Sequence, residues 1–188
     1  MSSELNVGRV ERNGIAPSSD RACGSLSLRL GHVSRKDYAM PMIDVYATAG
    51  TFTDKHQLAT DLAATLMAIE GVPDIPMFRQ NTATFIHELP AGDLSNVDGA
   101  SSYVRVQVLT NADALDRDKQ IAVVSQFTSM IADAAHDPAL AGRTWVLLTE
   151  AVPGGWGLDG HANTNDELVA AARKQIAQLQ AKAGGPAS

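Results

Sequence analysis

Apolar and polar residues alternate along Pro41–Ala47, with Ile43 and Val45 on one face of the expected strand and Asp44 and Tyr46 on the other. This period of two is typical of a half-buried β-strand. The next apolar residues recur at helical spacing, in a stripe made of Leu58, Leu62, Leu66 and Ile69. The pattern therefore predicts a strand followed by an amphipathic helix.

The ends of this helix are marked by residues that start or stop helices. Thr53 is expected to cap its first turn, and Gly71 with Pro73 is expected to end it. After a loop that contains Pro73 and Pro76, Thr82–Leu89 is expected to form a second strand. The connection is long enough for the two strands to pair in parallel, which predicts a β-α-β unit.

The same order of elements then repeats. Ser102–Leu109 alternates like the first strand, Asp116 can cap a second helix, and Thr144–Val152 is expected to be a fourth strand. The stripe expected on this helix consists of Ile121, Val124, Phe127 and Ile131. A glycine-rich turn over 154–160 and a helix from Asn165 to about Leu179 complete the chain. We predict an α/β (α+β) fold, in which tandem β-α-β units form a four-stranded mixed sheet with two helices on one face.

The other face of such a sheet lacks a cover. Its expected residues are Met42, Asp44, Tyr46, Tyr103, Arg105 and Gln107. Because an uncovered face is most simply buried by another copy of the chain, we expect a homo-oligomer.

Composition and charge narrow the function classes. The 188 residues include 45% hydrophobic and 19% charged side chains, and the net charge is −6. An acidic chain without a basic cluster argues against nucleic acid or a membrane surface as the partner, so a small molecule or a protein is expected. Cys23 is the one cysteine, which suits a reducing, cytoplasmic location.

The first 39 residues differ from the rest. They carry more basic than acidic side chains, lack helical or strand periodicity, and contain no apolar stretch long enough for a secretory signal. From Met40 onward the chain is strongly acidic. We therefore expect residues 1–39 to be a disordered extension and the folded domain to span 41–188.

Several motifs favour an ordinary explanation. Gly155–Gly160 matches G-x-G-x-x-G, but no parallel strand follows it, so a glycine turn is favoured over a dinucleotide site. The five histidines show no metal-binding spacing, and no G-x-S-x-G elbow is present. We expect neither a metal nor a cofactor. The helix-face carboxylates are expected to be solvated: Asp61, Glu70, Asp118 and Asp133.

The pair Met40-Pro41 opens the first strand. Proline is tolerated as the first residue of a strand, so a structural role is one reading. At a chain terminus, however, its ring nitrogen is a secondary amine that can take up a proton, whereas inside a chain it is an inert amide. The chemistry expected of Pro41 therefore depends on whether Met40 is removed.

Two stretches and the tandem strand-helix-strand pattern resemble the tautomerase superfamily, whose members carry a catalytic amino-terminal proline. They are Pro41–Gly50 (PMIDVYATAG) and Thr149–Gly160 (TEAVPGGWGLDG). The second is similar to the C-terminal hairpin of 4-oxalocrotonate tautomerase, with Trp156 at the place of an aromatic residue beside the active site. The double length and Glu88–Gly92 (ELPAG) are more similar to cis-3-chloroacrylic acid dehalogenase and malonate semialdehyde decarboxylase. The resemblance extends from Pro41 to about Leu179.

This resemblance implies a tautomerase/MIF-like fold, a true start at Met40 with removal of that residue, and a misassigned start site for residues 1–39. It also implies that Pro41 acts as the general base without a cofactor, in a homotrimer. The matches to the relatives' other residues fail: the dehalogenase histidine falls at Leu66, its tyrosine at Leu147, and Thr110–Leu115 lacks its arginine pair. The tautomerase arginine positions fall near Thr51 and at Ala83 or Trp145.

Substrate binding must therefore use other residues. In a parallel β-α-β unit the residues just before the second strand lie at the edge where the first strand begins, which brings Arg79 and Asn81 near Pro41. Arg79 is expected either to clamp a substrate carboxylate or to be a surface arginine.

Two more side chains are candidates with an ordinary alternative. Arg105 shares a sheet face with Asp44 and is expected either to pair with it or to bind substrate. Trp156 is expected either to wall the site, within the subunit or across a boundary, or to pack in the core. Since Ser101 and Ser102 open the second unit, one site per subunit is expected.

The sequence thus predicts an isomerase that shifts a proton in a small 2-oxo or enol carboxylic acid. One alternative keeps Pro41 as the base for hydration, dehalogenation or decarboxylation of an unsaturated or β-oxo acid. The other alternative is a non-catalytic oligomeric binding protein, which applies if Pro41 is internal.

Overall fold

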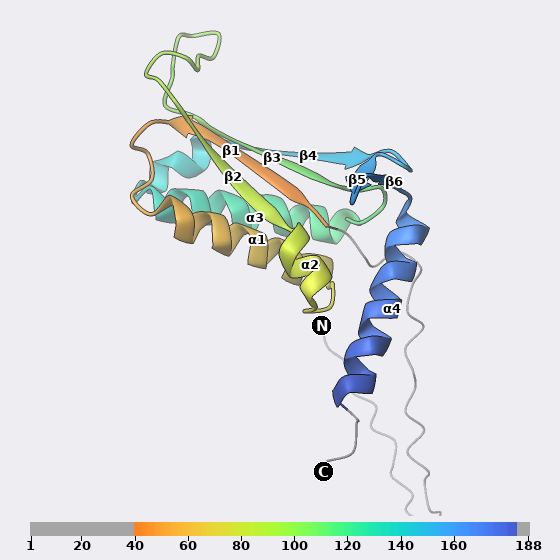
Figure 1. Cartoon of the computed structure of the whole chain (residues 1–188). Helices are drawn as coiled ribbons and strands as arrows, with labels where there is room; N and C mark the ends of the chain where they lie inside the picture. The colour runs from red at the N-terminus through yellow and green to blue at the C-terminus, as the bar shows by residue number, and fades with distance from the viewer. Residues whose placement is uncertain (1–39, 184–188) are drawn as a thin grey trace, which may run out of the picture. The chain divides into compact units, whose positions relative to one another are not determined.

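The computed structural model describes residues 40–183, which belong to one compact unit (Figure 1). The expected extension over residues 1–39 lies outside the described residues. The first unit consists of β1 (Met42–Thr48), α1 (Lys55–Glu70), α2 (Pro76–Asn81) and β2 (Ala83–Leu89). The second consists of β3 (Val104–Asn111), α3 (Arg117–Ala134), η1 (Pro138–Arg143) and β4 (Thr144–Ala151). A hairpin of β5 (Trp156–Leu158) and β6 (His161–Asn163) precedes α4 (Asn165–Ala183).

The four long strands form the mixed sheet predicted from the sequence. Their order is β2-β1-β3-β4, with β1 parallel to β2, β3 parallel to β4, and the central strands β1 and β3 antiparallel. Helices α1 and α3 lie side by side under one face of this sheet (Figure 1). The predicted arrangement of two tandem units is confirmed.

The core lies between the sheet and these two helices. The alternating residues Ile43, Val45 and Val106 are fully buried under α1 and α3. On α3 the expected Phe127 and Ile131 are buried, and Val123 joins them. The expected Ile121 and Val124 are instead 52% and 39% exposed. Val123, Phe127 and Ile131 recur every four residues and therefore lie on one face of α3, whereas Ile121 and Val124 lie at the side of that face.

The helix ends test the expected capping residues. Helix α1 is capped by Asp54 and not by Thr53, because Asp54 Oδ1 accepts a hydrogen bond from Gln57 N (2.9 Å). Gly71 ends the helix in a left-handed conformation (φ 76°), as predicted. Asp116 caps α3 as predicted, accepting from Lys119 N (2.9 Å).

Three short elements lie outside the predicted helices and long strands. Helices α2 and η1 each begin with a proline, which is well suited to a first helical turn, just before the second strand of their units. The glycine-rich segment over 154–160 forms β5 and the turn to β6, with Asp159 and Gly160 at positive φ. This hairpin is the feature that the resemblance implied for this segment.

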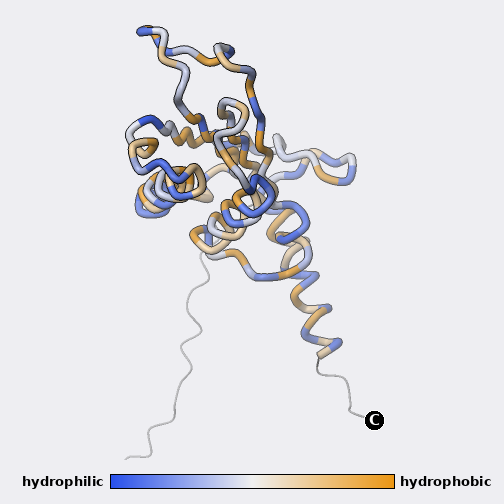
Figure 2. Tube along the Cα trace, turned by 90° about the vertical axis from the view of Figure 1, so that its left-hand side faces the viewer, coloured by the Kyte–Doolittle hydropathy of each residue, from blue (hydrophilic) through white to orange (hydrophobic). Residues whose placement is uncertain are grey.

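The face of the sheet away from the helices carries large apolar side chains. Phe85, Trp145 and Leu147 are 50%, 41% and 43% exposed. Helix α4 buries Leu168, Val169 and Ala172, and hydrophilic and hydrophobic stretches alternate along it in Figure 2. Among residues 40–183, no helix is long and apolar enough to cross a membrane.

Candidate functional site

Pro41 is buried and lies directly before the first residue of β1, a central strand of the sheet. Its carbonyl oxygen accepts a hydrogen bond from Ala83 N (3.4 Å) on β2. On the other side β1 pairs Met42 with Leu109, and one further step of this register sets Pro41 opposite Thr110. Pro41 therefore lies between the start of β2 and the end of β3.

Met40, the residue before it, is completely buried. Its N–H donates to Asn111 Oδ1 (3.2 Å), and Asn111 Nδ2 donates to Asn165 Oδ1 (3.2 Å) at the start of α4. Asn165 Nδ2 in turn donates to Ala112 O (2.8 Å). These two asparagines, which the sequence analysis missed, fix the backbone next to the Pro41 nitrogen.

The Met40 side chain belongs to a second apolar cluster, separate from the core under the sheet. Its other fully or nearly fully buried members are Ile75, Phe78, Trp156, Leu168 and Ala172. They come from α2 and the residue before it, from β5 and from α4. Trp156, a predicted site residue, thus packs within its own chain, in the same cluster as Met40. The Pro41 nitrogen is bonded directly to Met40.

Arg79 lies on α2, as a residue exposed to solvent. Its Nη1 contacts both carboxylate oxygens of Asp74 (3.0 and 3.3 Å). It also lines a cavity of about 580 Å³ between α1 and β2, together with Thr82 and Ala83. Since Ala83 contacts Pro41, this cavity reaches the residues that flank the proline, whereas Asn81 Nδ2 is engaged by Met77 O (2.7 Å).

The expected pairing of Arg105 with Asp44 is wrong. Asp44 Oδ1 instead contacts His87 Nε2 (2.6 Å), and the His87 ring stacks on Tyr46 (4.4 Å between centroids). Arg105 donates to Gln107 Oε1 (2.9 Å) and lies over the Tyr46 ring. The register explains the difference, because it sets Arg105 opposite Tyr46, and a histidine from the neighbouring strand β2 reaches Asp44.

Glu70 is the largest departure from the sequence analysis, which expected it to be solvated. It ends α1 and is 3% exposed. Burial raises its pKa to about 7, although a hydrogen bond from Thr110 and the charge of Lys119 both lower it. Its Oε1 accepts from Thr110 Oγ1 (2.9 Å), and its Oε2 has no hydrogen-bond partner within residues 40–183. Asp61, Asp118 and Asp133 are exposed as expected.

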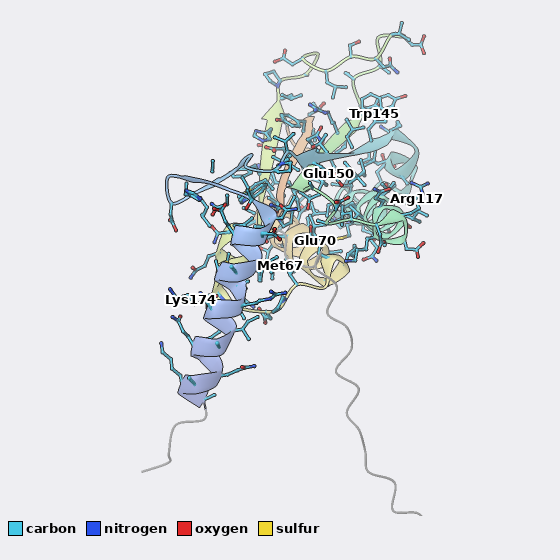
Figure 3. All side chains as sticks on the ribbon, turned by 90° about the vertical axis from the view of Figure 1, so that its right-hand side faces the viewer. Met67, Glu70, Arg117, Trp145, Glu150 and Lys174 are labelled. Atoms are coloured by element: carbon cyan, nitrogen blue, oxygen red, sulfur yellow. The ribbon has the colours of Figure 1, made fainter. Side chains whose placement is uncertain are left out.

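Figure 3 gives the setting of this carboxyl group. Glu70 and Met67 are labelled at the inner end of α1, while Lys174 extends outward from α4. In the described part of the chain, no three His, Cys, Asp or Glu side chains lie together in a way that could hold a metal ion. The candidate site is thus a buried proline that lies between Ala83 and Thr110 in the sheet and directly follows Met40 of the apolar cluster. The Thr110 hydroxyl links this place to the buried carboxyl group of Glu70.

Comparison with known proteins gives a fold and no sequence family. No family model matches the chain, and no curated protein matches it. Among solved structures, a symmetric trimer of wild-type fused 4-OT is 15% identical with a TM-score of 0.56, over 67% of this chain and 97% of that one. N1, a member of the cis-3-chloroacrylic acid dehalogenase family, is 17% identical with a TM-score of 0.56, over 75% of this chain and 96% of that one.

A third similar structure is Pt0534 inactivated by 2-oxo-3-pentynoate, with 17% identity and a TM-score of 0.53 over 66% of this chain and 95% of that one. The chain therefore has the fold of these tautomerase-superfamily proteins, and the fold implied by the resemblance is confirmed.

Proposed function

We propose that the chain is an enzyme of the tautomerase superfamily that uses Pro41 as a general base. In the active form Met40 and all residues before it are absent. The position of Pro41 carries the proposal: it is buried at the start of β1, in a fold shared with fused 4-OT and a member of the cis-3-chloroacrylic acid dehalogenase family. In the intact chain the Pro41 nitrogen is an amide, so the function requires a chain that begins at Pro41.

The chemistry follows from the properties of a secondary amine. A free α-amino group has a pKa of roughly 7.7–8.0, and burial favours its neutral form. The neutral nitrogen takes a proton from an enol hydroxyl or an acidic carbon and returns it at another atom of the same substrate. Because the proton comes back, the reaction needs no cofactor and is a keto-enol or 1,3-proton shift.

Removal of Met40 has a second consequence in this proposal. Its buried side chain would leave a space lined by Phe78, Trp156 and Leu168 beside the new amino terminus. An apolar substrate group of similar size would occupy that space, with Trp156 as one wall. Asn111 would lose the Met40 N–H and could accept from the protonated amine of Pro41.

Arg79 is the proposed clamp for the substrate carboxylate, with Asn81 on the same helix. Its present partner Asp74 is exposed, so exchanging this ion pair for a substrate carboxylate costs little. The shared cavity with Thr82 and Ala83 supports the assignment. A planar guanidinium can hold a 2-oxo carboxylate through two hydrogen bonds.

The assembly proposed is a homotrimer in the cytoplasm. Fused 4-OT has been solved as trimers, and the exposed Phe85, Trp145 and Leu147 give the open sheet face an apolar surface for a second copy. Arg105 lies on this face, so in the proposal it reaches a substrate only through a neighbouring subunit.

Inactivation by 2-oxo-3-pentynoate, the compound that inactivates Pt0534, tests the proposal. A chain that begins at Pro41 should be inactivated, and mass spectrometry of its peptides should find the adduct on Pro41. It should also turn over phenylenolpyruvate or 2-hydroxymuconate. An adduct only on other residues, or no turnover in an otherwise folded protein, would contradict the proposal.

Each alternative function has one observation in its favour. The likeness to N1 favours hydration, dehalogenation or decarboxylation with the same base, which malonate semialdehyde and chlorinated acrylates would reveal as substrates. The complete burial of Met40 favours a non-catalytic binding protein, because the space in front of Pro41 is filled while Met40 is attached. Turnover by the chain that begins at Pro41 excludes this second alternative for the processed form.

A further inference from the structure

Three buried side-chain oxygens lack a hydrogen-bond partner in the described part of the chain. Within residues 40–183 they are Glu70 Oε2, Thr82 Oγ1 and Thr84 Oγ1. The β1-β2 register, extended by one step, sets Thr82 beside Pro41. A buried carboxyl oxygen without a hydrogen bond costs stability, which makes Glu70 a candidate for a role beyond folding.

The sheet connects Glu70 to the proline through one residue. Thr110 lies opposite Pro41 in the extended β1-β3 register, and its hydroxyl donates to Glu70 Oε1 (2.9 Å). The odd-numbered residues of β1 and the even-numbered residues of β3 both point toward the helices, as the buried Ile43 and Val108 show. Thr110 and Pro41 therefore share the face of the sheet that Glu70 approaches from α1.

The charges around Glu70 are few. Lys119, at the start of α3, donates from Nζ to the Glu70 backbone oxygen (2.8 Å), and its charge acts on the carboxyl group. Asp116 caps the same end of α3, and Glu150 on β4 is paired with Thr110 but exposed. Arg79 on α2 pairs with Asp74. Lys119 is thus a cation next to Glu70, and it contacts the backbone oxygen and not the carboxyl group.

We infer that Glu70 is a positioning residue for the Pro41 amine, which sets through Thr110 how strongly the ring nitrogen holds a proton. The inference rests on the proposed function. An ionised Glu70 stabilises the protonated amine, whereas a neutral Glu70 leaves the amine free to lose its proton. The two groups then titrate as a coupled pair, so the pH dependence of the enzyme belongs to both of them.

The substitution Glu70→Gln in the chain that begins at Pro41 tests this coupling. Glutamine keeps the shape and an acceptor for Thr110 but cannot carry the charge. The pH midpoint for inactivation by 2-oxo-3-pentynoate, which reports the free amine of Pro41, should fall by about 1 pH unit, the size expected for one charge a side chain away at an effective dielectric constant of about 20. The acidic limb of kcat/KM should shift with it.

Two further variants separate charge from structure. Asp61→Asn changes an exposed carboxylate on the same helix α1 and keeps an acceptor for Gln57, so the midpoint should stay unchanged. Thr110→Val removes the hydrogen bond that lowers the pKa of Glu70, so the midpoint should move in the same direction as in Glu70→Gln, by a smaller amount.

The results distinguish this inference from the proposed function. If Pro41 is modified and the enzyme turns over, but the midpoint is the same in Glu70→Gln and in the parent, the inference is wrong and the proposed function stands. A uniform loss of activity at all pH values without a shift would assign Glu70 a structural role only. If Pro41 is not modified in the parent chain, the proposed function fails first.

Discussion

The two β-α-β units share one architecture but differ at the end where each begins. Pro41 opens the first unit under α2, α4 and the β5-β6 hairpin, next to the buried apolar cluster of Met40. In the second unit the residue directly before β3 is Tyr103, and beside it Arg143 donates to Ser102 O and pairs with Asp137 (2.6 Å). A cavity of about 400 Å³ lies at this end.

The two units differ in the elements that surround the start of their first strand. Both units bury the same kind of apolar stripe, so the repeat accounts for stability. In the described part of the chain, α2 with Phe78, the hairpin and α4 form the buried cluster that contains Met40 at the first opening. Enclosure removes water, which favours a neutral amine at Pro41 and strengthens any charge interaction around it. We therefore expect chemistry at one opening and not at the other.

The largest difference between the two openings should appear in turnover. Pro41→Ala, in the chain that begins at residue 41, should lower kcat/KM about 1,000-fold, because it replaces the ring amine that acts as base. Tyr103→Ala, at the equivalent place in the second unit, should leave kcat/KM within a few fold. Steady-state kinetics of both variants, with circular dichroism to verify folding, measure this contrast. Equal effects would contradict it.

Core substitutions in the two units should lower the free energy of unfolding by similar amounts. Leu62 on α1 and Phe127 on α3 are both fully buried against the sheet. Leu62→Ala and Phe127→Ala should each lower the free energy of unfolding by about 3–4 kcal/mol, whereas Ile121→Ala on the exposed flank of α3 should change it by less than about 1 kcal/mol. Urea unfolding gives these values. A large loss for Ile121→Ala would show that this side chain is buried in an assembly.

The buried carboxyl group of the first unit should make stability depend on pH. The folded-state pKa of Glu70, about 7, lies above its unfolded value of 4.5, so the native state binds the proton more tightly. The contribution of Glu70 to stability is therefore fully present below pH 4.5 and is lost as the pH rises through 7, by about 3 kcal/mol. Unfolding at pH 5 and pH 8 should show this loss in the parent and not in Glu70→Gln. The same slope in both proteins would refute the assignment.

The smallest contrast concerns two arginines that precede β2 and β4. Arg79→Ala should change stability by less than about 0.5 kcal/mol, since its ion pair is exposed, but should raise KM about tenfold if it holds the substrate carboxylate. Arg143→Ala should lower stability by about 1 kcal/mol, through loss of the bonds to Asp137 and Ser102, and leave KM unchanged. Unchanged KM in Arg79→Ala would exclude it as the clamp.

Much of the fold could be predicted because local patterns determine it. Alternation gave β1 and β3, and Gly71 and Asp116 marked helix ends through their own backbone and side-chain chemistry. Helices α2 and η1 were missed because each has six residues, too short for a periodic signal. The Arg105 pairing failed because the partner depends on strand register, which brings in His87 from another strand.

The site was less accessible to sequence reasoning. Pro41 and Trp156 could be named, but the burial of Met40 arises where α2, β5 and α4 converge, and no local pattern encodes that. Glu70 did leave a signal: it follows Leu58, Leu62 and Leu66 at the same spacing of four residues, which continues the buried stripe to a carboxyl group. A carboxylic acid that continues the spacing of an apolar stripe indicates a buried acid.

The central claim is that the working group is an uncapped ring amine at Pro41. The most direct measurement compares turnover by the full chain, with the Met40-Pro41 peptide bond verified as intact by mass spectrometry, with turnover by a chain that begins at Pro41. The account predicts turnover only in the second protein. Equal turnover by the intact full chain would contradict it.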